Sequence, residues 1–392
     1  MLRLEKHIGA EAFSIIRDEW ESLHRSLSPT VPFTGPLWNE LWWKHCRKRS
    51  FFSRDELLLI SARDSGGRLI AVAPMLRTNR PAGGPIRLRE IQFFGADPNM
   101  TELRGVVCNP SDQPCVLGQL SDLLHKEGLG FDWIRWQGVY MEGTATPERP
   151  NRSGTFFWTR HIPDYFIDLP KTWGAFETGL TKRVRKKLRS SLKELDRDGH
   201  KFELQITKFP SDVPAALDAF YRLHKERTKV RSYDVFANPE KQSFLNDYCV
   251  EMAKRDQLRI YSIGILGEIV ATRIGFLFGE QLYLYHSGNA IDWDRYSIMT
   301  VLLGEIFRSA ITDSFTRVNL STGNDRSKTR WRPEVVQYLD GVEVASGFGR
   351  LAMYSVYEFL RLRGNTQRFA QLKSNLNNTD QFQIPNVSDD VE

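Results

Sequence analysis

The sequence has few cysteines and no long hydrophobic run. Its 392 residues include only Cys46, Cys108, Cys115 and Cys249, with no Cys-x-x-Cys pair and no His nearby at ligand spacing. This pattern excludes a disulfide framework and predicts no metal site. No apolar stretch reaches the roughly 18 residues of a membrane span, and the charged N-terminus lacks the apolar segment of a signal peptide. We therefore expect a cytoplasmic protein.

A strong overall charge is also lacking. The chain carries 54 basic and 48 acidic residues, a formal net charge of +6. The whole excess lies between Lys182 and Lys201, because the basic and acidic residues elsewhere are equal in number. In this segment Val184, Leu188, Leu192 and Leu195 form one apolar stripe, which predicts an amphipathic helix that Gly199 terminates.

That basic helix allows two interpretations. One is an ordinary solvated face, as most charge runs are. The other is a binding surface for a polyanion, such as coenzyme A, a nucleotide sugar or an aminoacyl-tRNA, or for an anionic membrane. We predict Lys186 and Lys187 as its donor-binding residues, and we expect no specific DNA binding because interleaved aromatic residues are missing.

Aromatic residues are abundant, and the sequence contains an internal repeat. Aromatics make up 12 % of a chain longer than one hydrophobic core usually organises, so two domains are expected. Apolar runs predict one β-hairpin from Leu57 to Leu76 and another from Leu258 to Phe278. Each follows two helical patterns and precedes a strand, a helix and a further strand that ends in Gly, at Gly138 or Gly323.

This order predicts a tandem α+β fold with mixed central sheets flanked by helices. We expect an N-terminal domain at 1–150 and a C-terminal domain at 160–348, joined through a Pro-, Gly- and Arg-rich stretch. A helix is expected at 349–364, followed by a polar tail at 365–392.

The second half resembles the GNAT-type acyltransferases associated with bacterial cellulose and polysaccharide biosynthesis, distant relatives of the FemAB-type peptidoglycan transferases. The resemblance extends over nearly the whole chain. Its motifs are a Leu-His-x-x-Arg helix, a Gly-turn hairpin with a following Ala, a Tyr-x-Tyr strand with a Tyr-Ser helix start, and a Gly before Lys-x-x-Trp. They match Leu223, His224 and Arg227; Gly267 and Ala271; Tyr283, Tyr285, Tyr296 and Ser297; and Gly323, Lys328 and Trp331.

The resemblance implies tandem GNAT-like domains and an acyl-CoA donor. The sequence departs from the pattern after Ser297, where Ile298 and Met299 replace small residues, and the Gln/Arg-x-x-Gly-x-Gly/Ala pyrophosphate loop is missing. We still expect the donor phosphates at Arg295, Tyr296 and Ser297, because the free amides of a helix start attract anions. An ordinary helix cap is the alternative.

Acyl transfer also needs a proton acceptor and anion contacts. His224 and Arg227, three residues apart on one helical face, are predicted catalytic residues together with Lys328. His286 is a second candidate base, and strand alternation places it on the face opposite Tyr283 and Tyr285. A core histidine bonded to backbone is an equally open interpretation of His286.

The polar loop that follows the last strand is expected to hold the acceptor. Asn324 and Asp325 would bind a hydroxyl-rich or phosphorylated group, Trp331 would stack on a sugar or adenine, and Tyr285 is placed with them. The alternative is a solvated loop in which Trp331 anchors the packing.

The predicted function is an acyltransferase that acts on an amine or hydroxyl of a saccharide or cell-envelope precursor, with peripheral contact to a membrane or polysaccharide-synthesis machinery as a further expectation. The C-terminal domain would be catalytic, and the N-terminal domain structural or acceptor-shaping. Two alternatives remain open. One is a FemAB-like, aminoacyl-tRNA-dependent transferase, and the other is a non-catalytic scaffold of a polysaccharide-synthesis complex.

Overall fold

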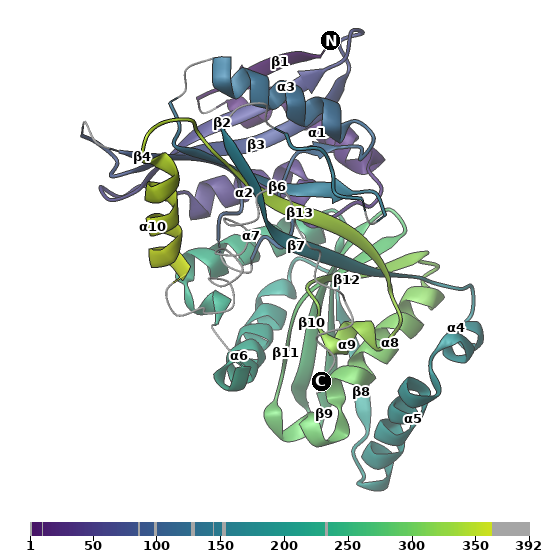
Figure 1. The fold of residues 1–392 in the computed structure, drawn as a ribbon. Helices are drawn as coiled ribbons and strands as arrows, with labels where there is room; N and C mark the ends of the chain where they lie inside the picture. Colours follow the sequence, from purple (N-terminus) through teal and green to yellow (C-terminus); the bar gives the residue numbers. More distant parts are fainter. Residues whose placement is uncertain are drawn as a thin grey trace. The chain divides into compact units, whose positions relative to one another are not determined.

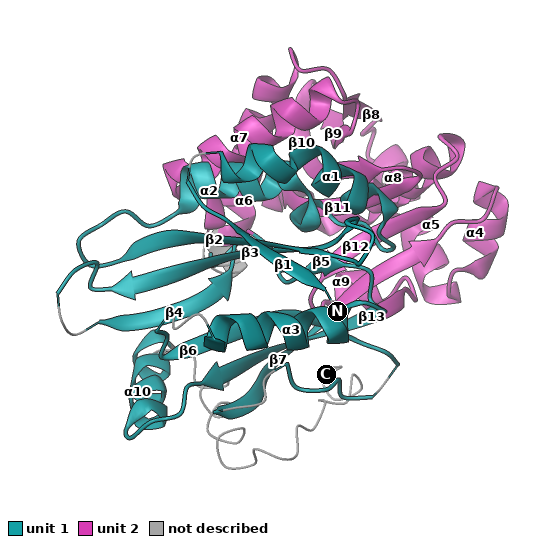
Figure 2. Ribbon diagram, turned by 90° about the horizontal axis from the view of Figure 1, so that it is seen from above, with its two compact units in different colours: residues 1–97, 101–163, 336–392 teal, residues 98–100, 164–335 magenta. Residues whose placement is uncertain are grey.

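The computed structural model describes residues 2–9, 11–84, 87–97, 100–126, 130–143, 145–150, 154–231 and 234–362. The chain divides into two compact units (Figure 2). Unit 1 comprises residues 1–97, 101–163 and 336–392, and unit 2 comprises residues 98–100 and 164–335. No helix in the described part of the chain is long and apolar enough to cross a membrane.

Unit 1 contains a mixed sheet with the strand order β1-β2-β3-β4-β6-β13 and the first part of β7 beside β13, while the short β5 pairs with β3. Its elements (Figure 1) are β1 (Arg3–His7), α1 (Ala12–Ser26), η1 (Pro32–Thr34), α2 (Pro36–Cys46), β2 (Arg54–Arg63), β3 (Leu69–Arg80), β4 (Leu88–Phe93), β5 (Val107–Cys108), α3 (Gln113–Lys126), β6 (Trp133–Met141), β7 (Thr155–Asp168), β13 (Glu334–Val344) and α10 (Arg350–Leu362).

Unit 2 repeats this plan with the strand order β7-β12-β11-β10-β9-β8. Its elements are α4 (Trp173–Gly179), α5 (Lys182–Arg197), β8 (Phe202–Thr207), α6 (Val213–Arg231), η2 (Val235–Ala237), α7 (Pro239–Lys254), β9 (Leu258–Ile265), β10 (Glu268–Phe278), β11 (Gln281–Asn289), η3 (Ile291–Tyr296), α8 (Ile298–Thr312), β12 (Arg317–Thr322) and α9 (Arg326–Thr329).

The predicted α+β class is confirmed, and the predicted repeat is visible in both units. Each unit has two helices, an antiparallel hairpin and a third strand, followed by a helix and a strand parallel to the third. The hairpins are β2–β3 and β9–β10, and the parallel pairs are β4–β6 and β11–β12. Sequence analysis missed the strands β1 and β8, which add to each hairpin as an antiparallel edge.

The end of each repeat departs from the predicted domain limits. Residues 164–168 of β7 pair with β12 in unit 2, whereas β13, which follows β12 in the chain, pairs with β6 in unit 1. The helix α10 then packs on unit 1, with the Tyr354 ring 5.4 Å from the Trp133 ring. The last described segment therefore belongs to unit 1 and not to the C-terminal unit.

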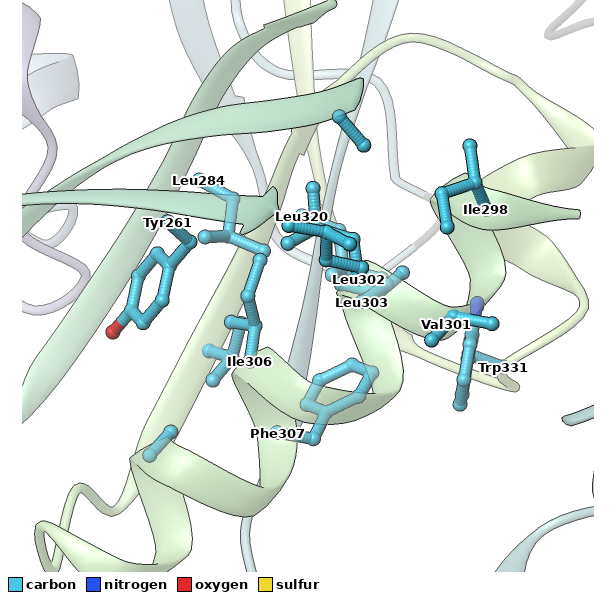
Figure 3. Close-up of a cluster of buried hydrophobic side chains, with 14 of the residues drawn as sticks. Tyr261, Leu284, Ile298, Val301, Leu302, Leu303, Ile306, Phe307, Leu320 and Trp331 are labelled. Carbon is cyan, nitrogen blue, oxygen red and sulfur yellow. The ribbon is translucent and has the colours of Figure 1, made fainter. Parts of the chain in front are cut away.

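The core of unit 2 lies between its sheet and α8 (Figure 3). Side chains Leu302 and Ile306 of α8 pack with Tyr261 and Leu284 of the sheet, and all four are fully or almost fully buried. Burial of each such side chain stabilises the fold by about 1.5–3 kcal/mol. The opposite face of the sheet carries α6 and α7, where Tyr248 packs against Phe276. The two helix layers fix the sheet whose edges carry the polar side chains described next.

Candidate functional site

The parallel strands β11 and β12 pair over only part of their length. The ladder joins residues 281–283 to residues 317–319, and both strands continue beyond it, to Asn289 and Thr322. The edge of β11 beyond Tyr283 is thus no longer part of this ladder. Backbone N–H groups on such an edge are strong donors for a ligand.

A β-bulge lies in β11 just after this point. Arg273 of β10 pairs with Ser287, and Gly275 pairs with Leu284, so Tyr285 and His286 together oppose Ile274. Two residues opposite one interrupt the alternation of faces. The predicted placement of His286 opposite Tyr285 is therefore wrong, because the alternation assumed a regular strand.

The bulge directs the half-buried His286 ring toward α6 and η2. Its centroid lies 5.5 Å from the His224 ring, 5.1 Å from the Phe236 ring and 4.3 Å from the Tyr285 ring. Tyr285 itself is buried, and its hydroxyl donates to the Met100 carbonyl at 2.6 Å. Tyr285 therefore supports the strand, while His286 keeps part of its ring at the surface.

Helix α6 approaches β11 closely at Gly288. A Cβ at this position would lie 2.5 Å from the His224 backbone N and 2.7 Å from the Leu223 carbonyl carbon. Only glycine permits this approach, because both neighbours are backbone atoms that cannot turn away. The contact sets His224 and Arg227, which occupy one helical face, directly over the strand.

The side chains of His224 and Arg227 both form hydrogen bonds with Ser287. The Nδ1 atom of His224 lies 3.1 Å from the Ser287 carbonyl oxygen, and Arg227 donates to the Ser287 hydroxyl. Since a carbonyl oxygen only accepts, Nδ1 carries the hydrogen and Nε2 keeps its lone pair. His224 is only 7 % exposed, and its Nε2 lies 3.6 Å from the carboxylate of Asp234.

The surroundings of His224 favour the neutral imidazole. Burial lowers its pKa from the usual 6.5, and the nearby Arg227 acts in the same direction, against the opposing effects of the Ser287 carbonyl and Asp234. Ser287 and Asp234 were not among the predicted site residues. The signal for Ser287 was its position between His286 and Gly288, whereas nothing in the sequence indicated Asp234.

The loop after β12 carries three of the predicted side chains. Lys328 donates to the Ser321 hydroxyl at 3.3 Å and to the Thr322 carbonyl, and Asn324 accepts from the Tyr165 hydroxyl at 3.3 Å. Burial raises the pKa of Asp325, but hydrogen bonds from Ser327 and the charges of Lys328 and Arg227 outweigh it, so the net shift is downward.

The charge of Arg227 on α6 thus contributes to the lowered pKa of Asp325 in this loop. The structure thus gathers His224, Arg227, His286 and Asp325 in unit 2, with Lys328 on the same loop as Asp325. They come from α6, β11 and the loop around α9, which are distant in the sequence.

The start of α8 differs from the predicted cap. Ser297 occupies the N-cap position in a left-handed conformation, with φ 52°, and its hydroxyl makes no capping bond. Ile298, which replaces a small residue of the family pattern, is fully buried in the core. Arg330 donates to Thr300 in the first turn at 2.9 Å, and its Nε atom is buried without a hydrogen-bond partner. Arg330 therefore adds a cation at the start of α8.

The two residues before Ser297 are engaged elsewhere. Arg295 donates to the Tyr296 hydroxyl, which in turn donates to Asp198 at 2.8 Å at the end of α5. The Arg295 guanidinium lies 4.4 Å from the Tyr296 ring centroid. Both residues therefore join α5 to the start of α8.

Trp331 is not a stacking platform in this structure. Its side chain is 3 % exposed and packs 5.0 Å from the Phe307 ring within the core of unit 2. The apolar ring is driven into the core because α8 presents a matching apolar face there. This is the packing role that the sequence left open as the alternative.

Helix α5 confirms the predicted amphipathic segment. Val184, Leu188 and Leu195 are buried, Leu192 is partly buried, and Gly199 follows the helix with φ 76°. A Cβ on Gly304 of α8 would lie 2.9 Å from the Leu188 side chain, so the two helices pack closely.

Helix α5 does not bring Lys186 and Lys187 to the start of α8. Its last residues contact Tyr296, and Lys187 is eleven residues earlier, about 16 Å along the helix axis. Lys186 and Lys187 are therefore not gathered with Ser297 as one donor site.

Comparison with known proteins identifies one matching family. Residues 182–329 match the family described as "Acetyltransferase (GNAT) domain". This part of unit 2 is therefore similar to a GNAT domain. The match, which we call the GNAT segment, spans α5, α6, the β11 bulge, α8 and all of α9, so all the gathered side chains lie inside it.

One solved structure is similar in fold over most of the chain, and two further structures match with lower scores. The crystal structure of FemX superposes with a TM-score of 0.57 at 10 % identity and covers 90 % of this chain and 99 % of that one. The C-terminal domain of a putative lysylphosphatidylglycerol synthetase from Agrobacterium fabrum gives 0.47 at 13 % identity, with coverages of 88 % and 97 %. A tandem GNAT protein from the clavulanic acid pathway gives 0.41 at 10 %, with 88 % and 99 %. The search of curated protein sequences found no match.

Proposed function

We propose that this protein transfers an acyl group from a coenzyme A thioester to an amine or hydroxyl of a saccharide or cell-envelope precursor in the cytoplasm. Polysaccharide biosynthesis, including that of cellulose, is the pathway that the sequence resemblance suggests. The observation that carries the proposal is the bulge in β11, which sets His286 beside His224 at the end of the β11–β12 ladder, inside the GNAT segment.

The donor phosphates would bind at the start of α8. The first amides of this helix offer donors, and the helix dipole favours an anion there. Arg330 adds a positive charge at the same turn, where burial lowers its pKa, and its Nε atom has an unused donor. Ile298, which stands where the family pattern has a small residue, would not block this end, because its side chain is buried in the core.

The thioester carbonyl would lie against the released edge of β11, where backbone N–H groups polarise it. The acceptor nitrogen or oxygen attacks the carbonyl carbon, and its proton passes to an imidazole. The C–N or C–O bond then forms, the C–S bond breaks, and the thiolate of coenzyme A leaves and takes up a proton.

His286 is our choice for the base, with His224 as its positioning residue. The Nε2 lone pair of His224 is buried beside Asp234, so an acceptor does not reach it in this structure. His286 is half-exposed, and its ring lies against the His224 and Phe236 rings. By its bond to Ser287, His224 fixes the backbone next to the base.

Arg227, Asp325, Asn324 and Lys328 would contact the acceptor. They combine cations, a carboxylate and an amide within one loop and one helix face, a mixture suited to hydroxyl groups and phosphates. The contribution of Arg227 to the lowered pKa of Asp325 supports this grouping.

Unit 1 would serve a structural or acceptor-shaping role. The parallel ladder between β4 and β6 also ends early, after the pair of Ile91 with Ile134. Beyond this pair, another segment of unit 1 lies against β6. A Cβ on Gly138 would lie 1.8 Å from the Arg104 carbonyl oxygen, and Gln113 bonds the backbone of Gly138 and Tyr140. The backbone of β6 at Gly138 is thus covered by the segment that contains Arg104.

The test is thiol release by the purified full chain with short and long acyl-CoAs and amino-sugar acceptors. We expect acceptor-dependent release, a loss of about 10²–10⁴-fold in kcat/KM for His286→Ala, and loss of the pH-dependent limb of the rate. His224→Asn should lower the rate, but the pH dependence of the rate should remain. His45→Ala, in unit 1, is the control. The proposal is refuted if the protein does not bind coenzyme A and releases no thiol with any donor.

A second candidate is transfer from an aminoacyl-tRNA. Helix α5 favours it, because the first turn of α5 lacks acidic residues and carries Lys182, Arg183 and Arg185 instead. Cations at a helix N-terminus destabilise the helix, so their accumulation there is better explained by a polyanionic ligand than by stability.

A further inference from the structure

An exposed aromatic pair stands at the tip of a tight loop in unit 1. Phe51 and Phe52 are 75 % and 79 % exposed, and their rings meet edge to face with centroids 5.7 Å apart. A closed turn holds them, since Ser50 N donates to the Ser53 carbonyl at 3.0 Å and Ser53 N donates to the Ser50 hydroxyl at 3.1 Å. Two adjacent rings held outward in this way are costly in water and indicate a binding partner.

Cations surround this tip. Arg49 and Arg54 flank the turn, pair with each other as an isolated β-bridge, and are exposed. The carboxylates that follow the turn in the chain already have partners. Asp55 accepts from Lys48 N at 2.7 Å, and Glu56 forms an ion pair with Arg77. The tip therefore presents apolar rings within a positive rim.

A second exposed apolar surface lies at the same end of the unit 1 sheet. The helix α10 buries Tyr354 but exposes Val356, Phe359 and Leu360 by 48–59 %. Arg80, at the end of β3, stacks 5.4 Å from the Tyr357 ring of α10, and two residues further on Ala82 N donates to the Phe51 carbonyl. The Phe51–Phe52 turn and α10 are thus joined through the end of β3 (Figure 1).

We infer that this surface, comprising residues 49–54 and the exposed face of α10, docks the protein on an anionic lipid bilayer. Aromatic and aliphatic side chains would enter the headgroup region while Arg49 and Arg54 meet lipid phosphates. A second copy of this chain fits less well, because a two-fold contact centred on the turn would oppose each arginine with like charge. The surface lies in unit 1 and is independent of the proposed reaction.

The test is co-sedimentation of the full chain with vesicles of phosphatidylcholine alone and of equimolar phosphatidylcholine and phosphatidylglycerol. We expect binding to the anionic vesicles only, weakened by salt. The double change Phe51→Ser with Phe52→Ser should lower the partition coefficient at least about tenfold. Each of Arg49→Gln and Arg54→Gln should lower it roughly fivefold, and Val356→Ser with Leu360→Ser should weaken it further.

Phe209→Ser is the matched control, because Phe209 is 68 % exposed but lies in unit 2. The thermal unfolding of each variant should match that of the native chain, since these side chains are at the surface. The inference fails if the native chain does not bind anionic vesicles. It also fails if the double change Lys186→Glu with Lys187→Glu removes binding while Phe51→Ser with Phe52→Ser does not. It also fails if the Phe variants instead convert a dimer to a monomer in light scattering.

Discussion

The Nδ1 atom of His224 lies 3.1 Å from the carbonyl oxygen of Ser287, and this contact joins a helix to a bulged strand. The contact exists because Gly288 lets α6 approach the β11 backbone. It also sets the tautomer of His224 and positions the strand next to His286. The first two predictions test this relationship.

His224→Asn should reduce the loss of stability on acidification. Burial lowers the native pKa of His224 below 6.5, so below that pH the unfolded chain takes up a proton that the native chain does not. Stability should therefore fall as the pH drops from about 6.5 toward the native pKa, and less so in the variant. Thermal unfolding across this range measures it, and an unchanged acid dependence would contradict the argument.

Gly288→Ala should destabilise the protein by about 1–3 kcal/mol or more, because the new methyl group meets the backbone of α6. Gly304→Ala, whose methyl group meets only the end of the Leu188 side chain, should cost less than about 1 kcal/mol, since alanine also favours the helix. Gly174→Ala, in open space, is the control. Urea unfolding ranks the three, and equal costs for Gly288 and Gly304 would refute the close approach.

Tyr285→Phe should cost about 1–3 kcal/mol, because it removes a buried hydrogen bond from the Tyr285 hydroxyl to the Met100 carbonyl. Tyr221→Phe removes a hydroxyl bonded to Asn246 at the surface and should cost much less. Chemical unfolding of both variants compares them. If the two changes cost the same, the Met100 contact contributes nothing specific.

Glu90→Gln should destabilise the protein by about 3–5 kcal/mol at neutral pH, because it leaves Arg135 and Arg80 beside an uncharged group. Despite burial, the two arginines lower the pKa of Glu90 from 4.5 to about 2, so its contribution is lost as the pH falls through that range. Acid unfolding should be correspondingly shallower in the variant. Glu56→Gln, in the partly exposed pair with Arg77, should cost under about 1 kcal/mol.

Lys186→Glu with Lys187→Glu separates the two donor hypotheses. If α5 receives tRNA, filter binding of total tRNA should fall by at least about tenfold and depend on salt. Affinity for coenzyme A should stay unchanged, because α5 carries these lysines about 16 Å from its contact with the α8 start. Lys126→Glu in unit 1 is the control. Loss of coenzyme A binding alone would instead place the donor on α5.

The sequence alone determined the local elements and their repeated order. Apolar runs predicted both hairpins, and the two helical patterns before each hairpin correspond to α1 and α2 and to α6 and α7. The stripe from Val184 to Leu195 predicted the buried face of α5. These features depend on neighbours in the chain, which the sequence displays directly.

Only the tertiary structure decided which face or partner each functional side chain meets. The bulge at Tyr285 and His286 depends on the pairing with β10, and the burial of Trp331 depends on the facing surface of α8. The pairing of β13 with β6 and the position of Arg330 at α8 likewise join segments distant in the chain. Such long-range contacts leave no periodic trace in the sequence, because the energy that selects them comes from packing and desolvation between elements.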